Sequence, residues 1–510
     1  MRNHRKPTRR AAIATVAAAP LAFSKSRRPN FLFILADDHA GYVMGCDGNR
    51  LALTPHIDRL AREGIRFSAH HCNSPVCTPS RQALLTGQLP HAAGVTVLGT
   101  PLALDKPTLA RQFQQAGYRT AVFGKMHFNR LPFPECTAST SAKLKNESPV
   151  IGPRPTPKPR RRGFARSPRG GPSKTPPESG STPIGSPSLP SNRACAELIW
   201  RIRQSNTWGS SRVTSPSRCG SVFRNPTLRK ISRWKTAPRF DPATFPVPRV
   251  GPDDASQIPL VFRDLSSAGK QGIIASYYTS VGFLDRNVGR VLEAVRRLGL
   301  DQDTFVVYTA DHGYCLGQHG RFEKHCGYEP ALRVPLIVGF PGRIHAGRVV
   351  SDLTEHVDVP ATVVDMLDLA PLPDQHGQSL RPYLEGRFPP HRRDHIFSEY
   401  LENEEAFIKT KKWKYIYCSG KRPRQDGYQT DRPTPGSYQR LYDLTYDPGE
   451  LNDVSLAHPV LVDRFQNLML DRFRATHPGH KSEPPGLERA HALDFYLTPR
   501  DAPPFPGVQA

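Results

Sequence analysis

The chain has 510 residues, 37% of them hydrophobic, and a mean hydropathy of -0.50. No apolar run reaches the ~20 residues that span a bilayer, and nine cysteines are too few for a disulfide scaffold. The formal net charge of +25 lies almost wholly in residues 1–29 and 141–230, and the remaining chain is close to neutral. We therefore expect neither a membrane span nor a nucleic-acid partner.

The N-terminus has the pattern of an export signal. A basic region containing Arg9-Arg10 precedes an apolar, alanine-rich stretch over 11–23. That stretch is too short to span a bilayer and has the length of a signal-peptide core, and the paired arginines resemble a twin-arginine signal. We expect residues 1–28 to direct export to the periplasm or the extracellular space. A frayed basic tail is the alternative.

The next part of the chain alternates strand and helix patterns. Residues 31–36 form an apolar run that predicts a strand, and 54–63 predict a helix that Gly64 closes. Residues 65–70 predict a second strand. Thr108 is expected to cap a helix that ends at Gly117, and 118–125 predict a further strand.

Residues 134–237 break this pattern. No aspartate occurs between Asp105 and Asp241, and proline, arginine and serine dominate in runs such as PRPTPKPRRR (153–162). We find no strand or helix periodicity there, and this composition cannot bury enough apolar surface to fold. Two explanations stay open: a disordered insertion, or a stretch translated in the wrong reading frame. The second, which we favour, is tested by translating the other frames of the gene.

Strand and helix patterns resume beyond this segment. A long helix is predicted over 273–298, with buried strands over 304–311 and 334–340. These elements predict an α/β fold with helices on both faces of the sheet. Short strands over 395–400 and 412–418 and a helix near 458–475 then indicate a smaller C-terminal α+β subdomain, which we assign to 391–510.

Acidic side chains follow two of the predicted strands. Asp37-Asp38 comes after the first strand, and Asp311-His312 ends the strand over 304–311. Sites in open α/β sheets form beyond the carboxyl ends of strands, so the two pairs could bind one hard divalent cation. Each pair alone could equally be a turn or a helix cap.

A cysteine lies between these pairs in an unusual string, Cys77-Thr78-Pro79-Ser80-Arg81. Pro79 is tolerated in the first turn of a helix, which places Cys77 at or just before a helix N-terminus. The free N–H groups and the dipole of that terminus favour an anion. A lone cysteine would mean little, but the complete string is specific.

With that string, the chain resembles the sulfatases of the alkaline-phosphatase superfamily, in which the cysteine is oxidised to formylglycine. The resemblance extends over about 29–130 and 240–454 and includes these stretches: RPNFLFILADDH (28–39), TPHIDRLAREGIRF (54–67), GKMHF (124–128), ADHG (310–313), GQHGRFEKH (317–325), RVPLIV (333–338) and LYDLTYDPGELND (441–453). It implies an alkaline-phosphatase-like fold, a large mixed sheet sandwiched by helices, and a catalytic domain over 29–390 that 134–237 interrupts.

The resemblance also implies the site residues. One calcium ion would be bound by the side chains of Asp37, Asp38, modified Cys77, Asp311 and His312. Imidazole is a softer ligand than calcium prefers, so His312 is the least typical of the five. Arg81 would hold the formylglycine hydrate, and the sulfate oxygens would contact Lys125, His127 and Lys324. Structural alternatives are a surface charge at Arg81, a strand-end histidine at His127 and a solvated Lys324.

The resemblance implies hydrolysis of a sulfated small molecule or glycan, and a formylglycine-generating enzyme as the maturation partner. One oxygen of the aldehyde hydrate would attack sulfur, and the other would later expel sulfate. Phosphate or phosphonate monoester hydrolysis and an inactive, polyanion-binding homologue are the alternatives. Sulfatases also use a mid-domain histidine to protonate the leaving alcohol, but this chain has none between His127 and His312. General acid catalysis contributes about 10²–10⁴-fold, so we expect low activity from this chain.

Overall fold

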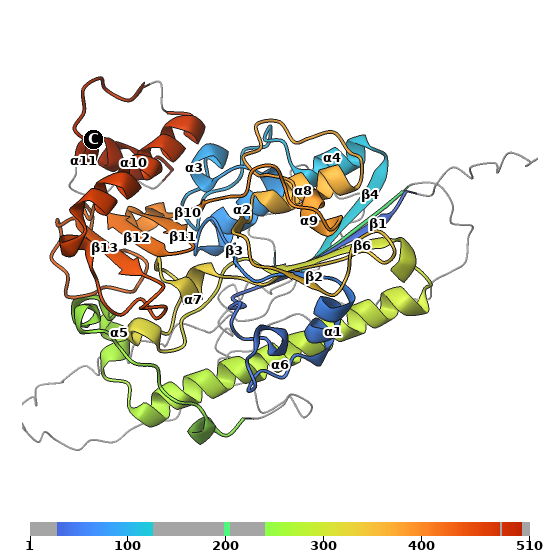
Figure 1. Ribbon diagram of the computed structural model, residues 1–510, viewed down its shortest axis with the longest axis horizontal. Coiled ribbons are helices and arrows are strands. Elements are labelled where there is room, and N and C mark those ends of the chain that lie inside the picture. Colours follow the sequence, from blue (N-terminus) through green and yellow to red (C-terminus); the bar gives the residue numbers. More distant parts are fainter. Residues whose placement is uncertain (1–27, 126–197, 205–239, 480–481, 502–510) are drawn as a thin grey trace, which may run out of the picture.

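The computed structural model describes residues 28–125, 198–204, 240–479 and 482–501, and of 198–204 only the backbone is described. Two sheets organise the chain. A seven-stranded sheet has the order β4-β5-β1-β6-β7-β2-β8, and a four-stranded sheet has the order β10-β11-β12-β13 (Figure 1). Among the described residues no helix is both long and apolar enough to cross a membrane.

The large sheet is mixed. Its central strands β1 (Asn30–Ala36) and β6 (Thr304–Ala310) are parallel, whereas β7 (Leu336–Gly339) is antiparallel to β6. The other strands are β2 (Ile65–Phe67), β4 (Tyr118–Phe123), β5 (Leu198–Gln204) and β8 (Arg348–Val350). A separate two-stranded sheet pairs β3 (His70–His71) with β9 (Thr354–Glu355).

Strand β5 corrects one expectation. It lies within 134–237, where the sequence shows no strand periodicity. Instead β5 pairs antiparallel with both β1 and β4 and fills the place between them. Because both edges of β5 are paired, the backbone groups of β1 on that side are not left open.

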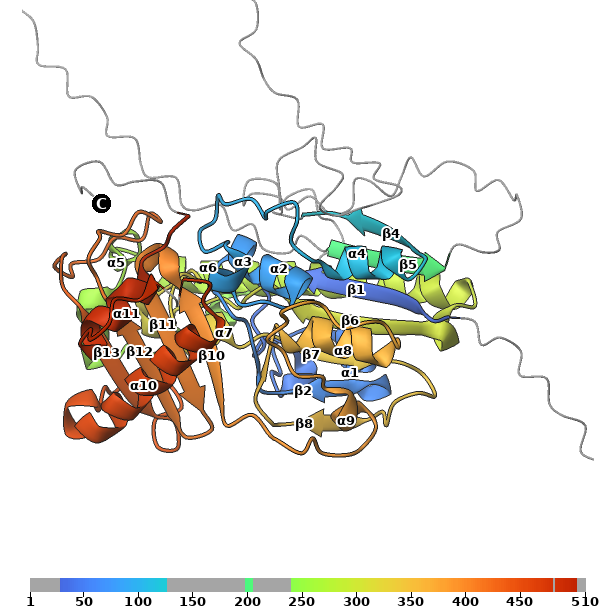
Figure 2. The ribbon, with the colours of Figure 1, turned by 90° about the horizontal axis from the view of Figure 1, so that it is seen from above.

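Helices cover both faces of the large sheet, as the alternation of strands and helices predicts. Two lie on one face: α1 (Pro55–Glu63) and the long α6 (Ser267–Arg297). The opposite face carries α2 (Cys77–Thr86), α3 (Pro90–Ala93), α4 (Leu109–Gln115), α8 (Asp358–Met366) and α9 (Arg381–Leu384) (Figures 1 and 2).

The pleat of β1 explains this sandwich. Alternate side chains of a strand point to opposite faces. Phe31 and Phe33 pack in one core cluster with Phe113 of α4, while Leu32 and Ile34 pack in the other with residues of α1 and α6. Every residue of β1 is buried, and after Asn30 the strand is apolar rather than alternating.

The four-stranded sheet belongs to the C-terminal part of the chain. It comprises β10 (His395–Tyr400), β11 (Glu405–Thr410), β12 (Trp413–Cys418) and β13 (Tyr438–Asp443), all antiparallel to their neighbours. Its core cluster includes residues of α10 (Pro459–Thr476) and α11 (Arg489–Leu497). Short helices α5 (Leu260–Arg263) and α7 (Glu329–Leu332) lie beside the two sheets.

Candidate active site

The two acidic pairs meet because their strands are neighbours. Strands β1 and β6 are parallel and in register, with Ala36 opposite Ala310. The next residues, Asp37 and Asp311, therefore leave the same edge of the sheet side by side, and the Asp311 amide donates to the Ala36 carbonyl at 3.0 Å. Asp37 and Asp311 are fully buried. The expectation that these strand ends converge is confirmed.

The backbone at Asp38 takes a special conformation that turns the chain at this edge. Its φ is +59°, in the left-handed region that few residues other than glycine adopt. Its amide donates to Asp311 Oδ1 at 3.0 Å, and its carbonyl accepts a 2.5 Å hydrogen bond from the Tyr277 hydroxyl. These two bonds hold the turn in a conformation that costs ~1–3 kcal/mol by itself.

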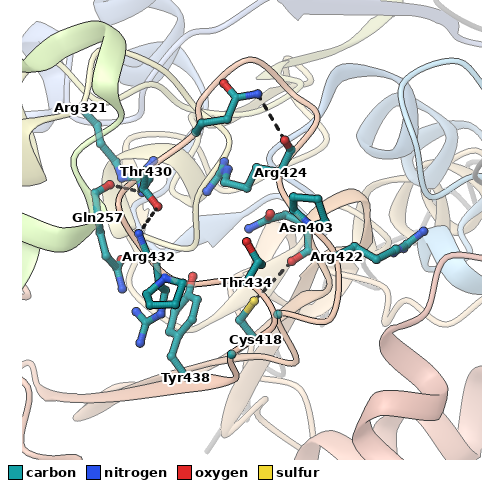
Figure 3. Close-up of a pocket in the computed structure, with 15 residues that line it drawn as sticks. Gln257, Arg321, Asn403, Cys418, Arg422, Arg424, Thr430, Arg432, Thr434 and Tyr438 are labelled. Carbon is teal, nitrogen blue, oxygen red and sulfur yellow. Dashed lines mark hydrogen bonds between the residues drawn. The ribbon is translucent and has the colours of Figure 1, made fainter. Parts of the chain in front are cut away.

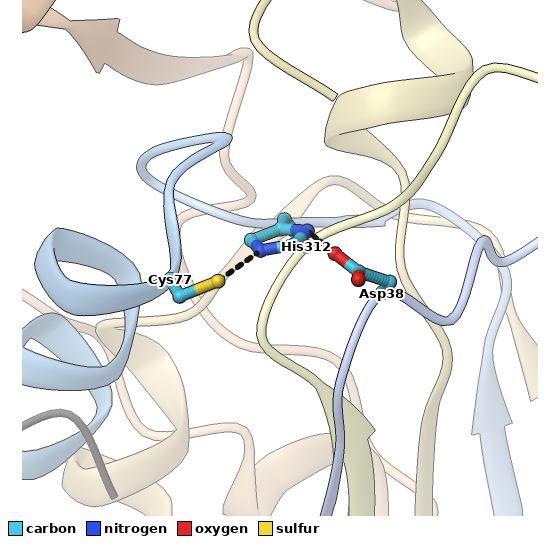
Figure 4. A group of neighbouring side chains, drawn as sticks. All are labelled: Asp38, Cys77 and His312. Carbon is cyan, nitrogen blue, oxygen red and sulfur yellow. Dashed lines mark hydrogen bonds and ion pairs between the residues drawn. The ribbon is translucent and has the colours of Figure 1, made fainter. Parts of the chain in front are cut away.

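Cys77 is the first residue of α2 and faces the acidic cluster. Its side chain is buried, and its Sγ lies 3.2 Å from Nε2 of His312 and 3.9 Å from Oδ1 of Asp37. Figure 4 shows the His312 ring between Cys77 and Asp38, with Nδ1 of His312 3.3 Å from Oδ1 of Asp38. Three segments that are far apart in the sequence thus converge on one sulfur atom.

Two lysines make the surroundings of Cys77 positive. The Nζ atoms of Lys324 and Lys125 lie 3.1 and 3.3 Å from Sγ. Burial opposes ionisation of the thiol, but Lys125 and Lys324 outweigh it and hold the pKa of Cys77 well below its ordinary value. A negatively charged group bound at this position would be stabilised in the same way.

Each lysine is also held by a carboxylate. Lys324 donates to Asp38 Oδ1 at 2.6 Å, and Lys125 donates to Asp37 Oδ1. The side chain of Lys324 is only 14% exposed, which excludes the solvated alternative for this residue. Both lysines can therefore face a bound anion from fixed positions.

Arg81 lies one helical turn after Cys77 and is almost fully buried. Its guanidinium donates to Asp311 Oδ2 from Nε and to Asp37 Oδ1 from Nη2, both at 2.9 Å, and to the Lys125 carbonyl. Burial raises the pKa of Asp311, but the positive charges of Arg81 and His312 outweigh burial and keep this pKa well below its usual range. Arg81 is thus no surface charge, and it clamps the two strand-end carboxylates.

The cluster has the donor set of a cation site. Asp38, Cys77 and His312 form one group of candidate ligands, and Asp37, Cys77 and Asp311 form a second, each with its ligand atoms within 4.8 Å of one another. Oδ2 of Asp37 is buried and has no hydrogen-bond partner among the described residues. Burial raises the pKa of Asp37 to about 8, with Lys125 acting in the opposite direction. A buried carboxylate with an unused oxygen fits a divalent cation.

The structure adds residues that the sequence alone did not indicate. The hydroxyl of Ser80 donates to the Asp311 carbonyl and lies 3.1 Å from Nδ1 of His356. Ser80 is part of the string Cys77-Thr78-Pro79-Ser80-Arg81, so its place in that string could have indicated a role at the site. Nothing in the sequence distinguishes His356, and Tyr277 looks like an ordinary core residue of a long helix.

One candidate residue cannot be placed, because His127 lies outside the described residues. A separate pocket lies between the C-terminal sheet and the loop over 420–436, and its lining includes none of the predicted site residues (Figure 3). Its four arginines are engaged within the protein: Arg321 with Glu323, Arg422 with Glu404, Arg424 with Asp426, and Arg432 over the ring of Tyr438 at 3.8 Å.

Family models match most of the described chain. The family described as Sulfatase matches residues 29–132 and 202–369, more than half of the sequence. A second, described as N-sulphoglucosamine sulphohydrolase, C-terminal, matches 317–470. The first match stops at 132, close to the start of the unusual segment, and resumes at 202, earlier than about residue 240, where the sequence motifs resume.

Individual proteins agree with the family match. An N-acetylglucosamine-6-O-sulfatase of Bacteroides thetaiotaomicron is 26% identical and covers 87% of this chain and 86% of its own. A mouse steryl-sulfatase is 28% identical over 83% and 78% of the two chains.

Solved structures agree on the fold. A structure of a protein in complex with its substrate D-glucosamine-2-N,6-O-disulfate has a TM-score of 0.60 and 20% identity, covering 91% of this chain and all of that one. A phosphonate monoester hydrolase of Agrobacterium radiobacter has a TM-score of 0.59 and 21% identity, covering 88% and 96%. Both likenesses support the expected alkaline-phosphatase-like fold. On the family match and the fold together, this chain belongs to the sulfatase family of sulfuric ester hydrolases.

Proposed function

We propose that this chain hydrolyses sulfate esters of carbohydrates, with formylglycine at position 77 and one bound calcium ion. The observation that carries the proposal is the position of Cys77, at the start of a helix, between two lysines and beside four candidate metal ligands. The similarity to an N-acetylglucosamine-6-O-sulfatase supports a carbohydrate as the alcohol part of the ester.

The calcium ion and the formylglycine would each supply chemistry that the unmodified side chains lack. Calcium, held by Asp37, Asp38, Asp311 and His312 with position 77, supplies positive charge for the sulfate oxygens. Formylglycine supplies an aldehyde hydrate whose oxygen can attack sulfur and whose second oxygen allows sulfate to be expelled, which a thiol cannot do.

The remaining chemistry belongs to the side chains of this chain. Lys125 and Lys324 hold the sulfate group by charge and hydrogen bonding, with His127 as a further contact. Arg81 pairs with both Asp37 and Asp311, and through them it sets the position of the cation ligands. A buried setting strengthens each of these contacts, because little water screens them.

The proposal includes low turnover. No histidine occurs between His127 and His312, so this stretch supplies no imidazole to protonate the leaving alcohol. The missing histidine is explained if residues 134–237 are an out-of-frame or inserted segment. The catalytic domain over 29–390, the C-terminal subdomain over 391–510 and the export signal over 1–28 complete the proposed organisation, with a formylglycine-generating enzyme acting during maturation.

The test measures which ester is cleaved. The full chain, produced together with a formylglycine-generating enzyme, is incubated with glucosamine 6-sulfate, an aryl sulfate, and the matching phosphate and phosphonate esters. We expect slow, calcium-dependent release of sulfate. Faster release of phosphate or phosphonate would favour the second candidate, which the likeness to a phosphonate monoester hydrolase supports. Rapid sulfate release would contradict the predicted impairment, and a formylglycine-containing chain without any release would contradict the function.

A further inference from the structure

Two cysteines outside the catalytic cluster lie in contact beneath it. Sγ of Cys315 and Sγ of Cys326 are 3.7 Å apart, and their residues are 0% and 3% exposed. Among the cysteines that the structure describes, no other pair of thiols lies within hydrogen-bonding distance. Both pack in the apolar cluster under the large sheet, together with Tyr328 and Leu332.

The backbone already holds these two positions together. The Cys315 amide donates to the Glu323 carbonyl at 2.9 Å, and the Gly317 amide donates to the Arg321 carbonyl at 2.8 Å. The chain between the cysteines is thus a closed loop whose ends are paired. Since a disulfide needs ~2.05 Å between its sulfurs, each sulfur has to move by less than ~1 Å.

We propose that Cys315 and Cys326 form a structural disulfide that fixes the active-site loop. The two thiols exchange with a disulfide oxidant, such as oxidised glutathione or an oxidised dithiol protein. One S–S bond forms and one breaks, the two electrons of the thiols reduce the oxidant, and its two sulfurs leave as thiols with the two protons. Because both thiols are buried, the bond forms while the chain folds or opens.

The proposed disulfide would connect two segments that carry active-site residues. Cys315 follows Asp311-His312 by three residues, and Cys326 follows Lys324 by two. The cross-link therefore joins the segment of the candidate metal ligands to the segment whose lysine contacts Cys77 and Asp38. Closing this loop restricts the unfolded chain and keeps Lys324 near the strand end when the region opens. The alternative is a pair of reduced thiols that act only as small apolar side chains.

Peptide mapping separates these two states directly. Arg321 and Lys324 lie between the cysteines, so trypsin cuts the loop and leaves the two cysteines on different peptides. The full chain is equilibrated with oxidised glutathione in urea below the unfolding midpoint, then denatured, alkylated and digested without reductant. We expect one cross-linked pair of peptides, lighter by two hydrogens than their sum. Recovery of both cysteines as alkylated free thiols would overturn the proposal.

Stability supplies a second, independent readout. We expect dithiothreitol to lower the thermal midpoint of the oxidised wild type and to leave that of Cys315→Ser unchanged. Cys418→Ser removes a buried cysteine of the other sheet and should retain both the cross-linked peptides and the dithiothreitol response. If Cys315→Ser fails to fold, the mapping of the wild type decides. An oxidised wild type that melts as the reduced one does would contradict the proposal, whatever the sulfatase activity.

Discussion

Removing the Arg81 guanidinium is the perturbation whose effect follows most directly from the geometry. Its two ion pairs, with Asp37 at 2.9 Å and with Asp311 at 2.8 Å, involve side chains that are all fully buried. In Arg81→Met the side chain keeps much of its volume, but Asp311 loses its ion pair with the guanidinium and Asp37 keeps only its ion pair with Lys125. Breaking a buried ion pair by removing one partner costs about 3–5 kcal/mol, because the remaining charge stays desolvated.

That loss is large enough to measure by thermal unfolding of the metal-free protein. At ~2–3 °C for each kcal/mol in a domain of this size, the midpoint of Arg81→Met should fall by roughly 6–15 °C. Arg263→Met is the matched control, because Arg263 pairs with Asp431 at the surface, with side chains that are 30% and 58% exposed. Such a pair contributes about 0–1 kcal/mol, so the control should melt within ~3 °C of the wild type.

The comparison can refute the reasoning. If Arg81→Met melts within ~2 °C of the wild type, the two carboxylates are not held by this guanidinium as the geometry indicates. Equal losses in Arg81→Met and Arg263→Met would mean that burial does not separate the two ion pairs. Calcium should restore part of the lost midpoint in Arg81→Met, because a cation between the carboxylates replaces the missing charge.

Three further predictions concern the site and its loop. Cys77→Ser should bind a sulfated sugar as the wild type does but lose turnover by at least ~10³-fold, measured by calorimetry and sulfate release. Lys324→Ala should weaken sulfate-ester binding and raise KM, since it removes a charge that lies 3.1 Å from Cys77. The pKa of Glu323 is lowered to about 2: burial opposes this shift, while hydrogen bonding from His325 and the Arg321 charge outweigh it. Its stabilisation, on the order of 3 kcal/mol, is complete above the unfolded pKa near 4.5 and is lost as pH falls toward 2.

Each of these three predictions can be contradicted by a specific measurement. Turnover retained in Cys77→Ser would exclude a nucleophile made from the cysteine. An unchanged KM in Lys324→Ala would mean that the lysine does not face the substrate. Glu323→Gln should flatten the stability profile between about pH 2 and 4.5, and a profile with the wild-type slope would show that this carboxyl is not responsible.

The acidic core of the site could be predicted because it depends on local order in the sequence. A buried strand followed at once by charged residues occurs twice, at Asp37-Asp38 and at Asp311-His312, and parallel pairing in register brings both ends to one edge. The helix N-terminus at Cys77 likewise follows from Pro79 and the recognised string. These signals depend on neighbouring residues and not on distant contacts.

Other parts depend on tertiary contacts that the sequence pattern does not encode. The strand predicted over 65–70 is divided, because β2 pairs in the large sheet while β3 pairs with β9 in a separate one. The helix predicted from residue 273 begins at Ser267, where the Ser266 hydroxyl accepts from the Gly269 amide. Strand β5 was missed because its alternation of apolar and charged residues covers only 200–203, inside a segment without other periodicity.

The positions of Ser80 and His356 illustrate the same limit. Ser80 reaches Asp311 and His356 only because the fold brings the first turn of α2 to the residue that follows β6 and to the segment just before α8. No spacing along the chain relates residues 80, 311 and 356. Contacts of this kind require the folded backbone, so they appear only with the structure.

The mass of the tryptic peptide that contains Cys77 tests the central claim most directly. The chain is produced together with a formylglycine-generating enzyme, and the peptide is compared with that of Cys77→Ser. The account predicts an aldehyde at position 77, in which one oxygen replaces the sulfur, the thiol hydrogen and one hydrogen of Cβ, and which reacts with a hydrazide probe. An unmodified thiol in every preparation would leave a sulfatase fold without its nucleophile and would contradict the proposed mechanism.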